Sequence, residues 1–115
     1  MSILVVDDQA DVLETTVELL QALGFEFIRA TSGEAALRLL QKEPGIEVLL
    51  TDVVMPGMNG VTLAQHAKRL SPTMKVILVS GYASPELQSA IARGENFQFL
   101  AKPYRVPDLA RILRL

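Results

Sequence analysis

The stretch that decides the fold is Ile3-Leu4-Val5-Val6-Asp7-Asp8, an apolar run that ends in two carboxylates. Apolar runs of this length are typical of buried strands. The same plan recurs three times, where Glu47–Thr51 leads into Asp52, Lys75–Val79 into Ser80, and Phe97–Ala101 into Lys102. Because the carboxyl ends of parallel strands share one edge of a sheet, the sequence predicts that these polar side chains converge there.

This convergence predicts a site for a cation and an anion. Asp7, Asp8 and Asp52 would repel one another unless a cation compensated their charge. Carboxylate oxygens are suitable ligands for a divalent cation such as Mg²⁺. Ser80 and Lys102 add a hydroxyl and an ammonium group, which suit an anionic ligand.

The segments between these strands have helical signals. A helical spacing of apolar residues follows Asp8, and we expect a second strand over Phe25–Ala30. Helix boundaries are indicated by a Gly24 cap, a capping box at Thr31–Glu34, an Asn59 cap, Ser84-Pro85 and Pro107. Leu70 shares one face of its expected helix with other apolar residues, and Ile91 continues the apolar pattern of the next one. Five strands alternating with five helices favour an α/β fold with a doubly wound parallel sheet.

The polar content of the strands predicts their order. The first, third and fourth strands are continuous apolar runs, as expected where helices cover both faces of a sheet. The strands at 25–30 and 97–101 contain polar residues, which is typical of sheet edges. With right-handed crossovers, these edges favour the order 2-1-3-4-5. The topological switch point then lies between the first and third strands, beside Asp7, Asp8 and Asp52.

The composition indicates one globular domain spanning residues 1–115. Half of the residues are apolar and there is no cysteine, so we expect neither disorder nor a disulfide framework. The formal net charge of −2 gives no electrostatic reason for nucleic-acid binding. We see no apolar run of about 20 residues and no secretion signal, so we expect no membrane contact and a cytoplasmic location.

In this order at strand ends, the motifs resemble the receiver domain of two-component response regulators. The matching pieces are Asp7-Asp8, Asp52 with Met55–Gly60, Ser80-Gly81 and Lys102-Pro103-Tyr104. The resemblance covers essentially the whole chain and implies a (βα)5 flavodoxin-like fold. Ser80–Ala83 and Lys102–Leu109 are most similar to receivers of hybrid sensor histidine kinases.

The resemblance implies a role for each carboxylate. Asp52 matches the aspartate that accepts a phosphoryl group from a phosphohistidine, carried by a histidine kinase or a histidine phosphotransfer domain. Asp7 and Asp8 match the acidic pair that binds Mg²⁺, or Mn²⁺ in its place, together with Asp52 and the main-chain carbonyl of Val54. Receivers of this kind catalyse their own phosphorylation and dephosphorylation and act as signalling switches.

The resemblance also implies how the switch works. Ser80 matches the hydroxyl that bonds a phosphoryl oxygen, and Lys102 matches the lysine that pairs with Asp52 and then with the phosphate. Phe99 occupies the aromatic switch position without a hydroxyl, and the Lys102–Pro103 bond is expected to be cis. Phosphorylation would change the surface at residues 84–93 and 104–113. A homodimer is compatible with this pattern.

Other functions explain the residues less well. A flavin carrier would need a hydroxyl- and glycine-rich turn where Asp7-Asp8 stands, and a haloacid dehalogenase-type phosphatase would need an acid at Val54. A phosphorylation-independent binding module of the same fold remains the alternative. We interpret His66 as solvated, and Tyr82 and Tyr104 as surface aromatics near the site. The sequence names neither the kinase nor the target, and fits a stand-alone regulator as well as part of a hybrid kinase.

Overall fold

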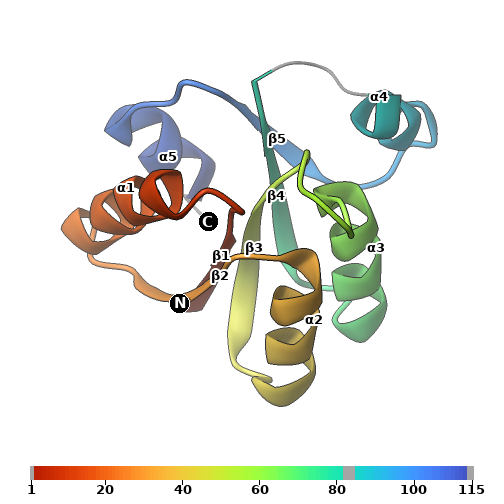
Figure 1. Ribbon diagram of the computed structural model, residues 1–115, viewed down its shortest axis with the longest axis horizontal. Coiled ribbons are helices and arrows are strands. Elements are labelled where there is room, and N and C mark those ends of the chain that lie inside the picture. Colours follow the sequence, from red (N-terminus) through yellow and green to blue (C-terminus); the bar gives the residue numbers. More distant parts are fainter. Residues whose placement is uncertain (1, 82–84, 114–115) are drawn as a thin grey trace.

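The computed structural model describes residues 2–81 and 85–113, in which five strands alternate with five helices (Figure 1). The elements are β1 Ser2–Val6, α1 Ala10–Ala22, β2 Glu26–Ala30, α2 Gly33–Lys42, β3 Ile46–Asp52, α3 Gly60–Leu70, β4 Lys75–Ser80, α4 Pro85–Ala92, β5 Gln98–Ala101 and α5 Val106–Leu113. Among these residues, no helix combines the length and the apolar character that a membrane span requires.

All strand pairs are parallel, and the sheet order is β2-β1-β3-β4-β5. This confirms the doubly wound flavodoxin-like fold and the strand order predicted from the polar content of the edges. Helices α1 and α5 cover one face of the sheet, while α2, α3 and α4 lie on the other (Figure 1). The three central strands are therefore covered on both sides, as their continuous apolar sequences indicated.

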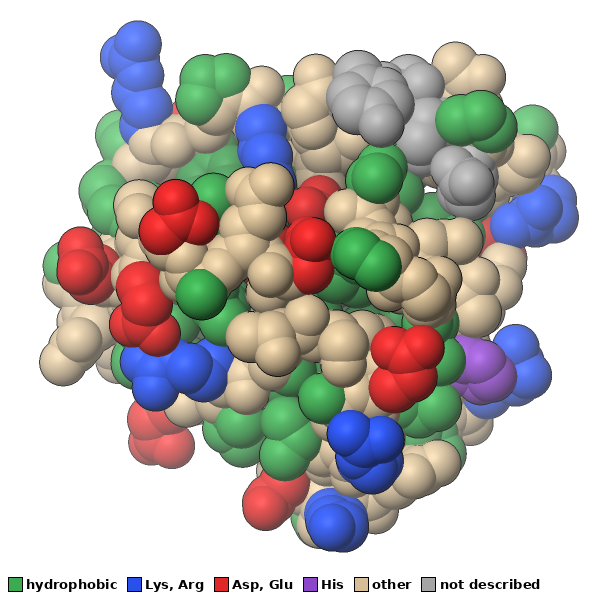
Figure 2. Space-filling model, in the orientation of Figure 1, with side chains coloured by type: hydrophobic (Ala, Val, Ile, Leu, Met, Phe, Trp, Pro, Cys, Tyr) green, Lys and Arg blue, Asp and Glu red, His purple; other side chains and the backbone are tan. Residues whose placement is uncertain are grey.

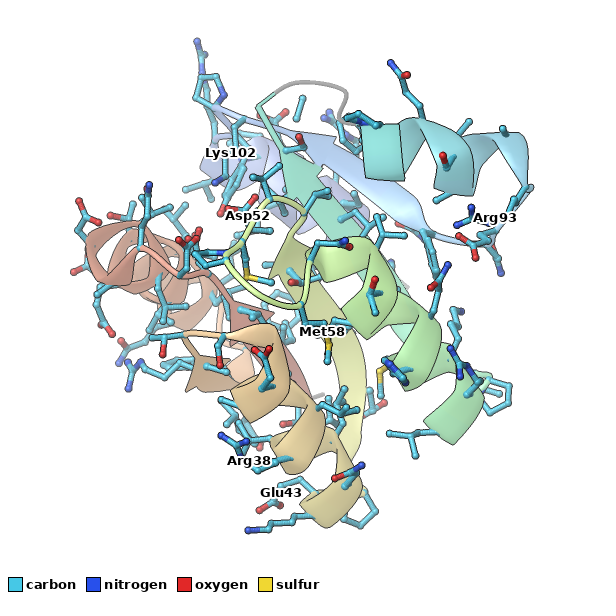
Figure 3. The ribbon with its side chains drawn as sticks, turned by 45° about the vertical axis from the view of Figure 1, so that its right-hand side comes forward. Arg38, Glu43, Asp52, Met58, Arg93 and Lys102 are labelled. Atoms are coloured by element: carbon cyan, nitrogen blue, oxygen red, sulfur yellow. The ribbon has the colours of Figure 1, made fainter. Side chains whose placement is uncertain are left out.

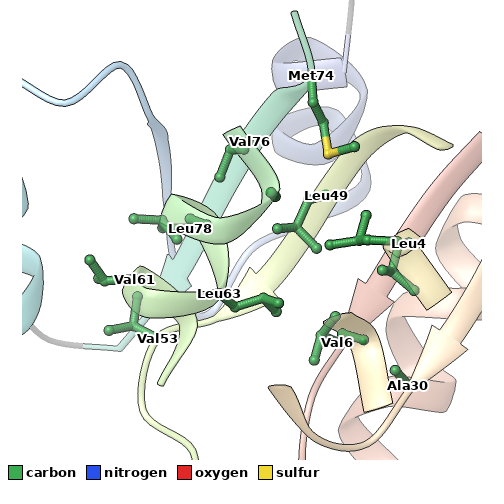
Figure 4. Close-up of a cluster of buried hydrophobic side chains, with 14 of the residues drawn as sticks. Leu4, Val6, Ala30, Leu49, Val53, Val61, Leu63, Met74, Val76 and Leu78 are labelled. Carbon is green, nitrogen blue, oxygen red and sulfur yellow. The ribbon is translucent and has the colours of Figure 1, made fainter. Parts of the chain in front are cut away.

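Alternate residues of the central strands feed two separate hydrophobic clusters. On β1, Leu4 and Val6 face α2 and α3, whereas Ile3 and Val5 face α1 and α5. Figure 4 shows the first of these clusters, and all four β1 side chains are at most 2% exposed. Burial on both faces fixes the register of the central strands, and so fixes where their carboxyl ends lie.

The start of α2 differs from the predicted capping box at Thr31–Glu34. The N-cap is Ser32, whose Oγ accepts a hydrogen bond from the Ala35 backbone N–H at 3.1 Å. Glu34 is then too early in the helix to close a box. Its carboxylate instead accepts a 3.3 Å hydrogen bond from the backbone N–H of Met58, in the loop after β3.

The other predicted helix starts fall close to the observed ones. Asn59 caps α3, with Oδ1 accepting from the Thr62 N–H at 2.9 Å. Helix α5 starts one residue before Pro107, and the Asp108 carboxylate accepts a 2.9 Å hydrogen bond from the Arg105 N–H. The predicted cap at Ser84 lies outside the described residues.

Two apolar side chains of the predicted helical patterns are exposed. Leu70 is 51% exposed because it is the last residue of α3, where the helix leaves the sheet. Ile91 is 66% exposed, because α4 buries the face that carries Leu87 and Ala90. Successive helical residues point about 100° apart, so Ile91 lies about 100° from Ala90, at the edge of the buried face.

We expect Gly60→Ala to destabilise the fold by roughly 3 kcal/mol, the upper end of the cost of overpacking. A Cβ at Gly60 would overlap the carbonyl oxygen of Asp52 and lie 2.9 Å from the Cα of Val53, so α3 would have to move away from β3. Urea denaturation followed by circular dichroism measures the change. Gly45→Ala is the control, since a Cβ there meets no atom within 4 Å. Equal stability of the two variants would contradict this account.

Candidate functional site

Three carboxylates meet at the carboxyl ends of β1 and β3. Val6 and Thr51 are register partners in these neighbouring strands, so the residues that follow them, Asp7 and Asp52, emerge side by side. Asp8 joins them, and one carboxylate oxygen from each of the three residues lies within 4.8 Å of the others. The predicted convergence at the switch point is therefore present.

The three carboxylates have different surroundings. Asp7 is 6% exposed, and its Oδ1 accepts a 3.0 Å hydrogen bond from the backbone N–H of Gln9. Asp8 is exposed and does not cap α1, because Gln9 holds the N-cap position. Asp52 is partly buried at the end of β3. One oxygen of Asp7 thus orders the turn into α1, while Asp8 presents its carboxylate to solvent.

Lys102 brings a positive charge to this cluster from the end of β5. Lys102 and Asp52 lie close together in Figure 3, with Lys102 Nζ 3.3 Å from Asp52 Oδ2. The same Nζ lies 3.7 Å from Asp7 Oδ2. Ala101 pairs with Ser80 in the sheet, and the Lys102 backbone N–H then donates to the Ser80 carbonyl at 3.0 Å. The Lys102–Pro103 peptide bond is cis. Lys102 is the one cation within ion-pair distance of these carboxylates among the described residues.

The electrostatics of the site raise the pKa of both Asp52 and Lys102. For Asp52, burial is the largest cause and the negative charge of Asp7 adds to it, which together outweigh the opposing effect of Lys102. For Lys102, burial lowers the pKa, but the charges of Asp52 and Asp7 outweigh it. The lysine is therefore held as an ammonium, yet it does not fully compensate the carboxylates.

The structure also places the other residues singled out from the sequence. Ser80, at the end of β4, is 2% exposed, and Val54, in the loop after Asp52, is 47% exposed. Backbone hydrogen bonds from Val53 to Val79 and from Gly60 to Val53 fix the start of this loop. Phe99 lies on the edge strand β5 with 46% of its surface exposed. His66 lies on α3 and is not part of the carboxylate cluster.

One aromatic residue has a different setting from the one predicted. Tyr104, expected on the surface, packs against the cluster between the sheet, α1 and α5, and its hydroxyl forms a hydrogen bond with the hydroxyl of Thr16 on α1. Burial raises the pKa of Tyr104. Sequence reasoning missed this pair, and the only signal was a threonine on the inner side of α1. Tyr82 lies outside the described residues.

Comparison with known proteins agrees with this geometry. The response regulator receiver domain family matches residues 3–114. The chain is 33% identical over 114 residues to the sensor kinase CckA of Brucella abortus, covering 98% of this chain but 12% of CckA. It is 33% identical over 107 residues to the response regulator receiver protein CpdR of the same organism, covering 93% of this chain and 88% of CpdR.

Solved structures show the same likeness. The receiver domain of the hybrid histidine kinase CckA has a TM-score of 0.80 at 32% identity, covering 96% of this chain and 94% of that one. A response regulator receiver domain protein from Clostridium thermocellum has a TM-score of 0.87 at 32% identity, covering 96% and 89%. Fold, strand-end carboxylates and sequence agree, and this chain belongs to the response regulator receiver domain family.

Proposed function

We propose that residues 1–115 form one receiver domain in which Asp52 accepts a phosphoryl group from the phosphohistidine of a histidine kinase or histidine phosphotransfer domain, in a Mg²⁺-dependent reaction. The observation that carries the proposal is the placement of Asp52 beside Asp7, Asp8 and the Lys102 ammonium at the switch point of the sheet. Receiver domains interact with histidine kinases or phosphotransfer proteins, and this family membership supports the choice of donor.

The donor set fits Mg²⁺. The three clustered carboxylate oxygens are hard ligands of the kind this cation prefers, and the exposed Asp8 leaves room for water molecules that the ion retains. Asp7, Asp8, Asp52 and the main-chain carbonyl of Val54 would hold the ion, with Mn²⁺ as a substitute. When bound, the ion neutralises negative charge on the transferring phosphoryl group.

The residues of the chain then have distinct tasks in the transfer. An oxygen of Asp52 attacks phosphorus, forming an O–P bond while the bond from phosphorus to the donor nitrogen breaks and the histidine leaves with the electron pair. Lys102, already 3.3 Å from Asp52, stabilises the charge on the phosphoryl oxygens. Ser80 supplies a hydroxyl to one of these oxygens. Such a reaction depends mainly on positioning and charge compensation.

Charge explains why the transfer would act as a switch. Three carboxylates are balanced by Lys102 and a divalent ion, so the resting site is close to neutral. An aspartyl phosphate carries a charge of about −2 in place of the −1 of Asp52, which leaves the site near −1. The new oxygens need donors, and Ser80, buried at the end of β4, is the neighbour that can move toward them.

The switch would be read on the face formed by α4, β5 and the start of α5. To this face the loop between α4 and β5 adds Arg93 and Glu95, which form an ion pair at 3.3 Å. Three of the five exposed large apolar side chains of the described residues lie there, namely Ile91, Phe99 and Val106. Mixed charge with separate apolar contacts suits a reversible partner, and a homodimer is one such partner.

The surface and the composition bear on the partners and the location of this domain. Acidic and basic side chains are interspersed over the face in Figure 2, and the net charge is −2, so we propose no nucleic-acid or membrane partner for this domain. A chain without cysteine suits the cytoplasm.

The full set of Asp52, Ser80 and Lys102 argues against a phosphorylation-independent binding module. The match to CckA, of which this chain spans 12%, leaves membership of a hybrid kinase as a proposal.

We expect Asp52→Asn to abolish labelling by radioactive acetyl phosphate, because the amide has no anionic oxygen to attack phosphorus. Removal of Mg²⁺ with a chelator should reduce labelling of the parent protein by at least about 100-fold, since the carboxylates are then uncompensated. Glu47→Gln, an exposed carboxylate on β3, is the matched control and should label like the parent. Unchanged labelling of Asp52→Asn would refute the assignment.

We expect Phe99→Ala to leave phosphorylation of Asp52 intact and to weaken the change on the α4–β5–α5 face. Phe99 carries no hydroxyl, so its inward and outward rotamers differ mainly in burial of the ring, and an alanine has no ring to bury. Chemical-shift mapping with Mg²⁺ and beryllofluoride, a phosphoryl analogue, follows residues 85–113. If the variant and the parent show the same shifts there, Phe99 is a packing residue and not part of the switch.

A further inference from the structure

Thr16 is an unusual buried polar residue. Among the described residues, the buried polar or charged side chains are Asp7, Thr16, Thr51 and Ser80, and Thr16 alone of these lies on a helix and not at a strand end. It is 4% exposed, and its hydroxyl bonds to the hydroxyl of Tyr104, which is 88 residues away in the sequence. Buried hydroxyls of this kind are kept where a specific partner satisfies them.

This pair lies directly beneath the carboxylate cluster. Thr16 and Tyr104 line a small internal cavity together with Asp7 and Asp52. Its volume of about 10 Å³ is at the lower limit of what one water molecule requires. Tyr104 therefore forms part of the wall of the small space beside the two carboxylates.

Tyr104 is also an anchor for the segment that carries Lys102. On one side, the Lys102 backbone N–H is bonded to the Ser80 carbonyl at 3.0 Å. On the other side, the next fixed point is Tyr104, two residues later, which is tied to α1 through Thr16. Without this second anchor, the backbone of Lys102 would be held mainly by its link to β4. Its long side chain would then populate many positions, and restricting it to the one beside Asp52 would cost more conformational entropy.

From this arrangement we propose that Thr16 and Tyr104 are a pair of positioning residues that hold the Lys102 ammonium over Asp52, by joining α1 to the segment after β5. The inference rests on the proposed phosphoacceptor function of Asp52. Neither hydroxyl touches the reacting atoms. Both act through the placement of Lys102, so their loss should slow transfer while leaving the Mg²⁺ ligands in place.

The test compares hydroxyl-deletion variants of the whole chain. Tyr104→Phe and Thr16→Val each remove one hydroxyl and keep the size of the side chain. We expect each to slow labelling by acetyl phosphate roughly five- to tenfold, the scale of a small misplacement of a reacting group. The affinity for Mg²⁺, from NMR titration of the Asp7, Asp8 and Asp52 amides, should not fall below that of the parent, because the metal ligands are intact and a displaced Lys102 competes less for their charge.

Three further variants separate positioning from general damage. The double variant Tyr104→Phe/Thr16→Val should be no slower than either single variant, because both remove the same hydrogen bond. Thr16→Ser keeps the hydroxyl and should restore most of the rate. Thr15→Val is the matched control on the same helix and should leave the rate unchanged, since the Thr15 hydroxyl is exposed and donates only to the Asp11 carbonyl of its own helix, at 3.0 Å.

A second readout follows Lys102 itself in the absence of phosphodonor. The ε-methylene NMR signal of Lys102 should shift in Tyr104→Phe and in Thr16→Val, and stay in place in Thr15→Val. If both hydroxyl deletions label at the rate of the parent, or if Mg²⁺ affinity falls in parallel with the rate, the positioning role is refuted. If the parent itself is not labelled at Asp52, the proposed function fails instead, so the two failures are distinguishable.

Discussion

Repulsion among three carboxylates within 4.8 Å of one another is the constraint from which the arrangement of this site follows. Asp7 and Asp52 cannot move apart, because β1 and β3 are neighbouring strands whose side chains are buried on both faces. Relief must come from positive charge. Lys102 supplies part of it, at 3.3 Å and 3.7 Å, and a divalent cation would supply the remainder.

The same rigidity connects the site to the surface. Two hydrophobic clusters, one on each face of the sheet, hold the central strands. The proposed switch residues lie outside these clusters, at strand ends. Ser80 and Lys102 follow neighbouring strands β4 and β5, and the Lys102 N–H is bonded to the Ser80 carbonyl. Phe99 lies on β5, three residues before Lys102, so the proposed switch would act along this strand. Under the proposed function, an added charge at Asp52 would alter the α4–β5–α5 face while the two clusters keep the core folded.

Much of this was predictable from the sequence because it depends on strand ends. The central strands are continuous apolar runs, the edge strands are mixed, and together these patterns fixed the sheet order and so the meeting of Asp7, Asp52 and Lys102. The register of parallel strands does not depend on side-chain detail at the site. Predictions that used only the strand order and the positions of the strand ends agree with the structure.

Predictions that depended on which side chains touch across elements did less well. The Thr16–Tyr104 hydrogen bond joins residues 88 positions apart, and no local pattern encodes it. Glu34 was expected to close its own helix but bonds to the Met58 N–H, because α2 packs beside the loop after β3. The exposure of Ile91 also depends on how α4 is seated, which its helical spacing alone cannot determine.

The most direct test is to locate the phosphoryl group chemically. An aspartyl phosphate is an acyl phosphate, and borohydride reduces it to homoserine, which mass spectrometry can assign to one position in the chain. After reaction with acetyl phosphate and Mg²⁺, the account predicts homoserine at position 52 and at no other aspartate. Unmodified aspartate at position 52, with the phosphoryl group found at His66 or another residue, would contradict it.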